Sequence, residues 1–161
     1  MNKDEIENLK TGRNLDSKVA VEVMGYIWLK HLLQFSAELA VKWLGTPADL
    51  KESCGMYVVV PDSQFVALKE RENSTESIPK FSTEMGPARQ VVSRMKELGY
   101  EYDLQTKTEQ GVDVHYVYFQ KPGSLCEQRP IGFPGLPEAI VKGALLATLG
   151  TKKGHFSACD E

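Results

Sequence analysis

The length, composition and charge of this chain describe one ordinary protein domain. Its 161 residues are 42% hydrophobic and 25% charged, and the formal net charge is -3 at pH 7. A chain of this size buries about 70% of its unfolded surface on folding, so its core needs no metal or disulfide crosslink. The negative net charge disfavours duplex nucleic acid as a partner, because such binding relies on neutralising phosphates with basic side chains.

The sequence carries no pattern for export or membrane insertion. Its acidic beginning lacks the apolar stretch of a signal peptide. No uninterrupted apolar run approaches the roughly 20 residues that span a bilayer. The three cysteines, Cys54, Cys126 and Cys159, are widely scattered, which is typical of reduced thiols rather than of a disulfide framework. We therefore expect a cytoplasmic protein with no membrane partner.

The first apolar pattern predicts a helix that begins at Asp16. This residue is a suitable N-cap, and Leu15 and Ala20 occupy the positions of a hydrophobic staple. Two adjacent columns of apolar side chains follow at helical spacing, one with Val19, Val23 and Ile27 and the other with Ala20, Met24 and Trp28. The apolar pattern continues from residue 26 to residue 44. Either Gly25 divides this region into two helices, or one long helix runs through it.

The segment from Met56 to Val60 predicts a strand. It is a short apolar run rich in β-branched residues, which favours a strand that is covered on both faces and lies inside a sheet. Residues 69–77 have mixed charge and no large apolar side chain, so we expect an exposed loop there.

A second helix and a hairpin are predicted in the middle of the chain. Apolar residues recur at i, i+3, i+4, i+7 and i+10, namely Ala88, Val91, Val92, Met95 and Leu98. Gly99 is suited to end this helix, and Ser82 would cap it if the helix began at Thr83. Polar and apolar residues then alternate over 100–107 and again over 112–119, which predicts a β-hairpin.

A final helix is framed by Pro137 and Glu138 at its start and by Gly150 at its end. Its residues are apolar almost all round the helix. Such a helix is either deeply buried or part of a subunit interface. We expect residues 151–161 to form a frayed, flexible tail.

The sequence contains no motif of an established catalytic or cofactor site. Histidine and cysteine do not recur at the spacing of a zinc site, and neither a nucleophile elbow nor a phosphate-binding loop is present. For His115, in the predicted hairpin, a hydrogen-bonded structural role is more common than that of a catalytic base. We therefore expect no metal and no cofactor, and the sequence favours a non-enzymatic protein without excluding an enzyme.

The best candidate for ligand binding is the segment Phe81, Ser82 and Thr83, ahead of the second helix. Free backbone N–H groups and hydroxyls at a helix N-terminus can bind an anion, and an aromatic ring can stack on a base. Arg89, one to two turns further along the helix, could add positive charge. The alternative is that Ser82 only caps the helix and that Phe81 packs in the core.

The large aromatics of the first helical region form a second group of interest. Tyr26, Trp28 and Trp43 belong to it, and Trp28 is also a candidate ligand-binding residue. Core packing is the common role of tryptophan. Exposure of Trp28 or Trp43 would instead favour homo-oligomerisation through this region.

Three helix-start segments, read in order, resemble a known family. They are residues 15–25 (LDSKVAVEVMG), 79–84 (PKFSTE) and 136–146 (LPEAIVKGALL). Together they resemble the phage ABA sandwich domain, a family of small αβα proteins of bacteriophages and prophages that mostly have no assigned activity. The resemblance implies an α/β fold, a three-layer αβα sandwich with a small, mainly antiparallel sheet. It would form one domain over residues 1–150, with an insertion around 29–78.

Three functions are compatible with these observations. The first is a non-enzymatic phage or prophage accessory protein that binds a small anionic, nucleotide-like ligand, for instance by sequestering a nucleotide signal of host antiviral defence. The second is a protein–protein interaction module that acts as a homo-oligomer, through the final helix or the tryptophan-bearing insertion. The third is an enzyme that degrades such a nucleotide messenger.

Overall fold

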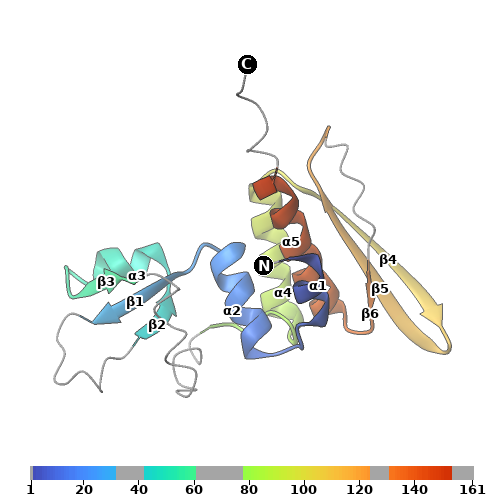
Figure 1. Ribbon diagram of the computed structural model, residues 1–161, viewed down its shortest axis with the longest axis horizontal. Helices are drawn as coiled ribbons and strands as arrows, with labels where there is room; N and C mark the ends of the chain where they lie inside the picture. The colour runs from blue at the N-terminus through green and yellow to red at the C-terminus, as the bar shows by residue number, and fades with distance from the viewer. Residues whose placement is uncertain (1, 32–41, 61–77, 124–130, 154–161) are drawn as a thin grey trace.

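The structure, a computed structural model, describes residues 2–31, 42–60, 78–123 and 131–153 (Figure 1). In chain order, its elements are α1 (Lys3–Asn8), α2 (Arg13–Glu22), β1 (Ile27–His31), β2 (Lys42–Gly45), α3 (Pro47–Glu52), β3 (Tyr57–Val59), α4 (Met85–Glu97), β4 (Glu101–Glu109), β5 (Val112–Gln120), β6 (Gly132–Phe133) and α5 (Leu136–Lys153). The α/β class and the antiparallel pairing are as predicted. The strands are divided between two sheets, ordered β2-β1-β3 and β4-β5-β6, where the sequence had indicated one.

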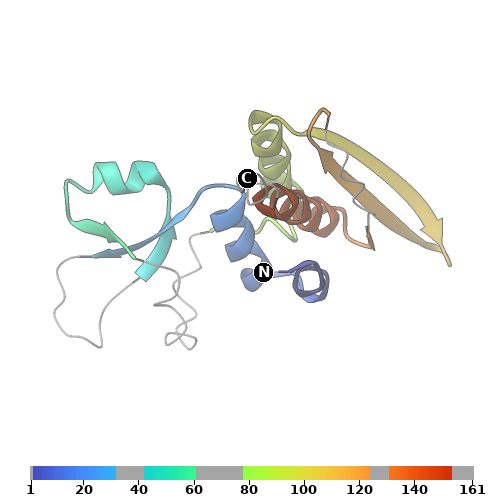
Figure 2. The ribbon, with the colours of Figure 1, turned by 45° about the horizontal axis from the view of Figure 1, so that its top comes forward.

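Helix α5 lies at the centre of the fold. It contacts β5 and β6 on one side and the helices α1, α2 and α4 on the others (Figures 1 and 2). Its buried apolar residues are Ala139, Ile140, Val141, Ala144, Leu145 and Ala147. The apolar character that it shows all round its circumference is therefore explained by burial within its own chain. The helix extends three residues beyond Gly150, so residues 151–153 are helical where a tail was predicted.

Gly143 lets α5 approach β5 closely. A Cβ atom at this position would lie 3.0 Å from the Val117 carbonyl oxygen and 3.3 Å from its Cγ1 atom. Contacts this short with a strand backbone leave no room for a branched side chain, so the helix and the sheet would have to separate.

Gly143→Val is expected to lower the free energy of unfolding by about 1–3 kcal/mol, as overpacking of a well-filled core does. Chemical denaturation measures this loss. Gly143→Ala is the matched control, because its single methyl group meets the same contacts while gaining up to about 1 kcal/mol of helix propensity. A valine variant as stable as the wild type would contradict the close packing.

The β4–β5 hairpin confirms the predicted alternation. Its register runs from Glu101 opposite Gln120 to Glu109 opposite Val112. The two residues of the turn, Gln110 and Gly111, have φ of 51° and 81°. Positive φ at both positions is typical of a type I′ turn, whose twist matches that of the two strands. The second helix is likewise confirmed as α4, and Gly99 follows it with a φ of 83°.

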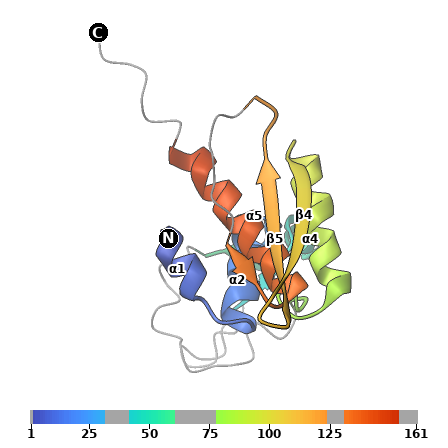
Figure 3. The ribbon, with the colours of Figure 1, turned by 90° about the vertical axis from the view of Figure 1, so that its right-hand side faces the viewer.

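The hairpin is covered by helices on one face (Figures 2 and 3). On the covered face, Val117 and Phe119 are buried, and Phe119 lies against the ring of Tyr102 with ring centroids 5.3 Å apart. The distal part of the same face is exposed at Thr106 and Thr108. The hairpin therefore projects past its helical support toward the turn.

The helical prediction for residues 26–44 is wrong in the described part of this region. Helix α2 ends at Glu22, and Gly25 follows with a φ of 77°, a left-handed conformation that stops the helix. Residues 27–31 and 42–45 are strands of the smaller sheet. The run of Ile, Trp and Leu after Gly25 fits both a helical and a strand pattern, and its pairing with β2 and β3 makes it a strand. Residues 32–41 lie outside the described residues.

The smaller sheet lies on the other side of the helices from the larger one (Figures 1 and 2). It contains much of the predicted insertion around residues 29–78. Helix α3 covers this sheet. It begins with a capping box, in which Thr46 Oγ1 accepts from the Asp49 N–H and Asp49 Oδ2 accepts from the Thr46 N–H. Leu29 is fully buried in this sheet, and Leu44 reaches the main core.

The strand predicted over Met56–Val60 forms as β3, but its predicted burial is wrong. It lies at the edge of the smaller sheet, and Met56, Val58 and Val59 are 49%, 36% and 55% exposed. A continuous apolar run does not by itself distinguish a central strand from an edge strand, because sheet order depends on contacts distant in sequence. The loop predicted over 69–77 lies outside the described residues.

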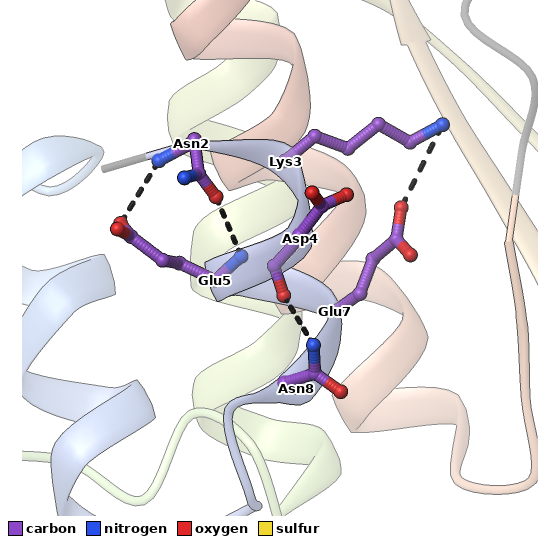
Figure 4. Close-up of polar contacts among 6 residues, drawn as sticks. All are labelled: Asn2, Lys3, Asp4, Glu5, Glu7 and Asn8. Atoms are coloured by element: carbon purple, nitrogen blue, oxygen red, sulfur yellow. Dashed lines mark hydrogen bonds and ion pairs between the residues drawn. The ribbon is translucent and has the colours of Figure 1, made fainter.

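Helix α1 is short and is held at both ends, and the polar contacts within it are drawn in Figure 4. A capping box at its start joins Asn2 and Glu5: the Asn2 side chain accepts from the Glu5 N–H at 2.8 Å, and Glu5 accepts from the Asn2 N–H at 2.9 Å. In its last turn, the Glu7 carbonyl accepts from the ammonium group of Lys142 on α5, at 2.9 Å. Lys142 is 2% exposed and also pairs with Glu138 at 2.8 Å. This buried lysine therefore connects α1 to the central helix.

Candidate functional site

The segment predicted to bind an anion is largely buried. Phe81 is 0% exposed and Ser82 is 2% exposed, both in a turn ahead of α4. The helix begins at Met85 with Glu84 as its N-cap, so the prediction that Ser82 caps it is wrong. The alternative that places Phe81 in the core is confirmed.

Ser82 instead connects this turn to the first turn of α2. Its hydroxyl accepts a hydrogen bond from the Gly12 N–H at 2.9 Å, and its own N–H donates to Asp16 Oδ1 at 2.6 Å. Asp16 was predicted as the N-cap of the first helix, but that position is occupied by Gly12, and Asp16 lies within the first turn. Its carboxyl group accepts a hydrogen bond from the backbone of Ser82, which is distant in sequence, rather than from its own helix.

The surroundings of Ser82 disfavour an anion. Asp16 is 3% exposed and sits in contact with Ser82, so a bound anion would face a second negative charge in a poorly solvated place. Burial raises the pKa of Asp16, and the hydrogen bond from the Ser82 N–H opposes that rise. The polar groups of Ser82 already serve to join the two segments.

The Asp16 carboxyl is expected to make stability pH-dependent. Because its pKa is raised in the folded state, the folded protein binds the proton more tightly, so this group's contribution is greatest below the unfolded pKa of about 3.9. The contribution falls as pH rises through the folded pKa and is constant above it. Asp16→Asn removes the titration but keeps the acceptor oxygen. The difference in unfolding free energy, wild type minus variant, should therefore fall from about pH 4 upward and then level off. A difference that rises over that interval would contradict the raised pKa.

The other predicted ligand residues do not join Ser82 in one site. Thr83 and Arg89 are exposed, the latter on α4 next to the buried Ala88. Trp28 is half-buried in β1, in the smaller sheet. The five predicted residues are thus divided among the core, the surface and a second sheet.

Two further residues singled out in the sequence have structural roles. The Nδ1 atom of His115 lies 3.0 Å from the Thr106 hydroxyl across the hairpin, as a hydrogen-bonded histidine should. Trp43 is half-buried, and its ring meets that of Tyr57 edge-to-face at a centroid distance of 4.7 Å.

Across the described ranges, no three histidine, cysteine, aspartate or glutamate side chains are grouped so that they could hold a metal ion. Within the same ranges, no helix is long and apolar enough to cross a membrane.

The outer edge of β4 is the most distinctive exposed feature of the structure. β4 is nine residues long and lies at the end of the β4-β5-β6 order, so no described strand pairs with its outer edge. The chain is described without a break from 78 to 123, on both sides of this strand. In the sequence, by contrast, β2, β3 and β6 each lie within two positions of residues that are not described.

The register shows which backbone groups face outward. In a hairpin closed by a two-residue turn, the flanking residues form a hydrogen-bonded pair, and such pairs alternate along the ladder. Counting from Glu109 opposite Val112, the odd-numbered residues of β4 use their backbone groups toward β5. The even-numbered ones, Tyr102, Leu104, Thr106 and Thr108, direct N–H and C=O groups outward. These groups form a ready template for another strand.

The side chains of β4 add charge to this template. On the face away from the helices they are Glu101, Asp103, Gln105, Lys107 and Glu109. Lys107 Nζ lies 5.2 Å from the ring centroid of Tyr116, whose hydroxyl donates to Glu109. That hydrogen bond raises the pKa of the Tyr116 phenol. The edge thus presents backbone groups together with charges of both signs.

The sequence predicted this hairpin but not its free edge. The available signal was the sparse apolar content of 101–109, where only Tyr102 and Leu104 are large apolar residues. A strand with so little to bury is typical of a sheet edge. Which edge stays free also depends on β6 pairing with β5, through the contact of Tyr116 with Gly132.

Comparison of the chain with protein-family models, with curated proteins and with solved structures finds no match.

Proposed function

We propose that this chain is a non-enzymatic interaction module that binds an extended segment of a partner by strand addition at the outer edge of β4. The observation that carries the proposal is the nine-residue edge strand β4, whose outer edge pairs with no strand in the described part of the chain and whose faces are both exposed in the distal half. Main-chain hydrogen bonds would supply affinity, and the alternating side chains would select the partner. The phage or prophage setting, which rests on the sequence resemblance, is part of the proposal, as is action in the cytoplasm.

The small-anion hypothesis stays a prediction and receives less support from the geometry. Two of its residues, Phe81 and Ser82, are buried, and the carboxyl of Asp16 occupies the hydrogen-bonding position beside Ser82. Equilibrium dialysis against cyclic dinucleotides and ADP-ribose derivatives tests it directly. If one of these nucleotides is depleted by the wild type but not by the Thr83→Ala, Arg89→Ala double variant, the small-anion hypothesis would be favoured over strand addition.

Peptide display on the immobilised full-length protein tests strand addition. Thr106→Pro is the counter-selection variant, because proline removes an outward N–H and is tolerated on the free side of an edge strand. Thr106→Ala retains the N–H and is the matched control. We expect enriched peptides with alternating strand patterns that bind the wild type and the alanine variant, with at least tenfold weaker binding to Thr106→Pro. Peptides that bind all three proteins equally would contradict the proposal.

A further inference from the structure

The backbone groups and charges of the β4 edge are complementary to those of a second β4 edge. Consider two β4 strands that pair antiparallel about a two-fold axis. The residue numbers of any two facing residues then add up to the same sum along the whole pair. Outward-facing residues must meet outward-facing residues for the backbone groups to pair, so the sum must be even. The candidate axes therefore pass through single residues near the middle of the strand, from Asp103 to Thr106.

Charge distinguishes among these registers. An axis at Leu104 places Glu101 opposite Lys107 of the second copy, twice by symmetry, and Asp103 opposite Gln105. Opposite charges directly across a strand pair attract, and like charges repel. The Leu104 register contains the attractive pair without any like-charge pair.

Each neighbouring register contains a repulsion. An axis at Gln105 pairs Asp103 with Lys107 but sets Glu101 against Glu109. An axis at Thr106 sets Asp103 against Glu109, and an axis at Asp103 sets two Asp103 side chains against each other. Among these four, the Leu104 register is the one that the charges favour.

We propose that the occupant of the β4 edge is a second copy of this chain, in the register centred on Leu104. The inference rests on the proposed strand addition and names its partner. Two three-stranded sheets would join into one antiparallel sheet of about six strands, with the helices of both copies on the same side. The 36%-exposed Leu104 side chains would meet on the two-fold axis. Pairing removes the exposed edge, which soluble proteins otherwise have to protect.

A cysteine scan of the full chain tests the register. In a background with Cys54, Cys126 and Cys159 changed to serine, single cysteines are placed at positions 103, 104, 105 and 106. Facing residues of a hydrogen-bonded pair have Cα atoms about 5.5 Å apart, within reach of a disulfide. We expect oxidised dimer to form most with Leu104→Cys. In this register Thr106 faces Tyr102 of the second copy, so the two Thr106 positions are offset by four residues, about 13 Å along the strands. Thr106→Cys should therefore form little oxidised dimer.

Charge reversal gives an independent measurement on exposed residues. Lys107→Glu and Glu101→Lys should each weaken self-association about tenfold in sedimentation equilibrium, and the double exchange should restore it. A crosslinking maximum at another position would overturn the register. A monomer at all concentrations, with no crosslink at any of the four positions, would overturn the second copy as occupant. The strand-addition proposal fails separately, if displayed peptides bind Thr106→Pro as well as they bind the wild type.

Discussion

Replacing Phe81 by alanine is expected to lower the free energy of unfolding by about 3–5 kcal/mol, the usual cost of truncating a fully buried aromatic side chain. The ring is 0% exposed and belongs to the main core. Chemical denaturation followed by circular dichroism measures the loss. Phe81→Leu is the matched control, because it keeps most of the apolar volume, and it should lose less stability than the alanine variant.

The same variant decides the role of this residue. A ring that stacked on a ligand at the surface could be removed with a change within about 0.5 kcal/mol. A stable Phe81→Ala protein would therefore contradict the core assignment and revive the ligand site at residues 81–83.

Replacing Lys142 by methionine is the second change with a large expected effect, a loss of about 3–5 kcal/mol. The ammonium group is buried between the Glu138 carboxylate at 2.8 Å and the Glu7 carbonyl at 2.9 Å, and it lies 4.4 Å from the ring centroid of Phe133. Its removal leaves Glu138, whose side chain is 17% exposed, as a largely buried charge without this partner. Urea denaturation at neutral pH measures the effect.

An exposed ion pair within α1 provides the control. Lys3 lies 3.6 Å from Glu7 with its side chain 55% exposed (Figure 4), so Lys3→Met should cost less than about 1 kcal/mol. Changing Glu138 to leucine together with Lys142→Met should recover part of the loss, because it removes the uncompensated charge. Equal losses in the Lys3 and Lys142 variants would contradict the structural importance of the buried pair.

The sequence was sufficient for elements whose pattern is long and local. Helix α4 and the β4–β5 hairpin follow from periodicity over eight or more residues, and the turn between the strands falls at Gln110 and Gly111. Helix α5 was predicted as apolar all round, and its burial within the chain was one of two stated alternatives. In each case neighbouring residues carry the information that selects the structure.

Prediction failed where short segments depend on distant contacts. The apolar residues after Gly25 fit a helix or a strand, and pairing of β1 with β2 and β3 makes them a strand. Ser82 was interpreted from its own neighbours, but its partners are Gly12 and Asp16, about 70 residues earlier in the chain. The free edge of β4 depends on where β6 pairs. The contacts of β1 and of Ser82 leave no local pattern in the sequence, and the β4 edge leaves only the sparse apolar content of 101–109.

Residue-resolved amide hydrogen exchange on full-length protein, diluted until it is monomeric and then saturated with a selected strand peptide, tests the strand-addition proposal most directly. We expect the N–H groups of Tyr102, Leu104, Thr106 and Thr108 to gain protection on binding. Those of Asp103, Gln105 and Lys107, which already face β5, should change little. Protection confined to other parts of the chain, or equal gains at even and odd positions of β4, would contradict binding at this edge.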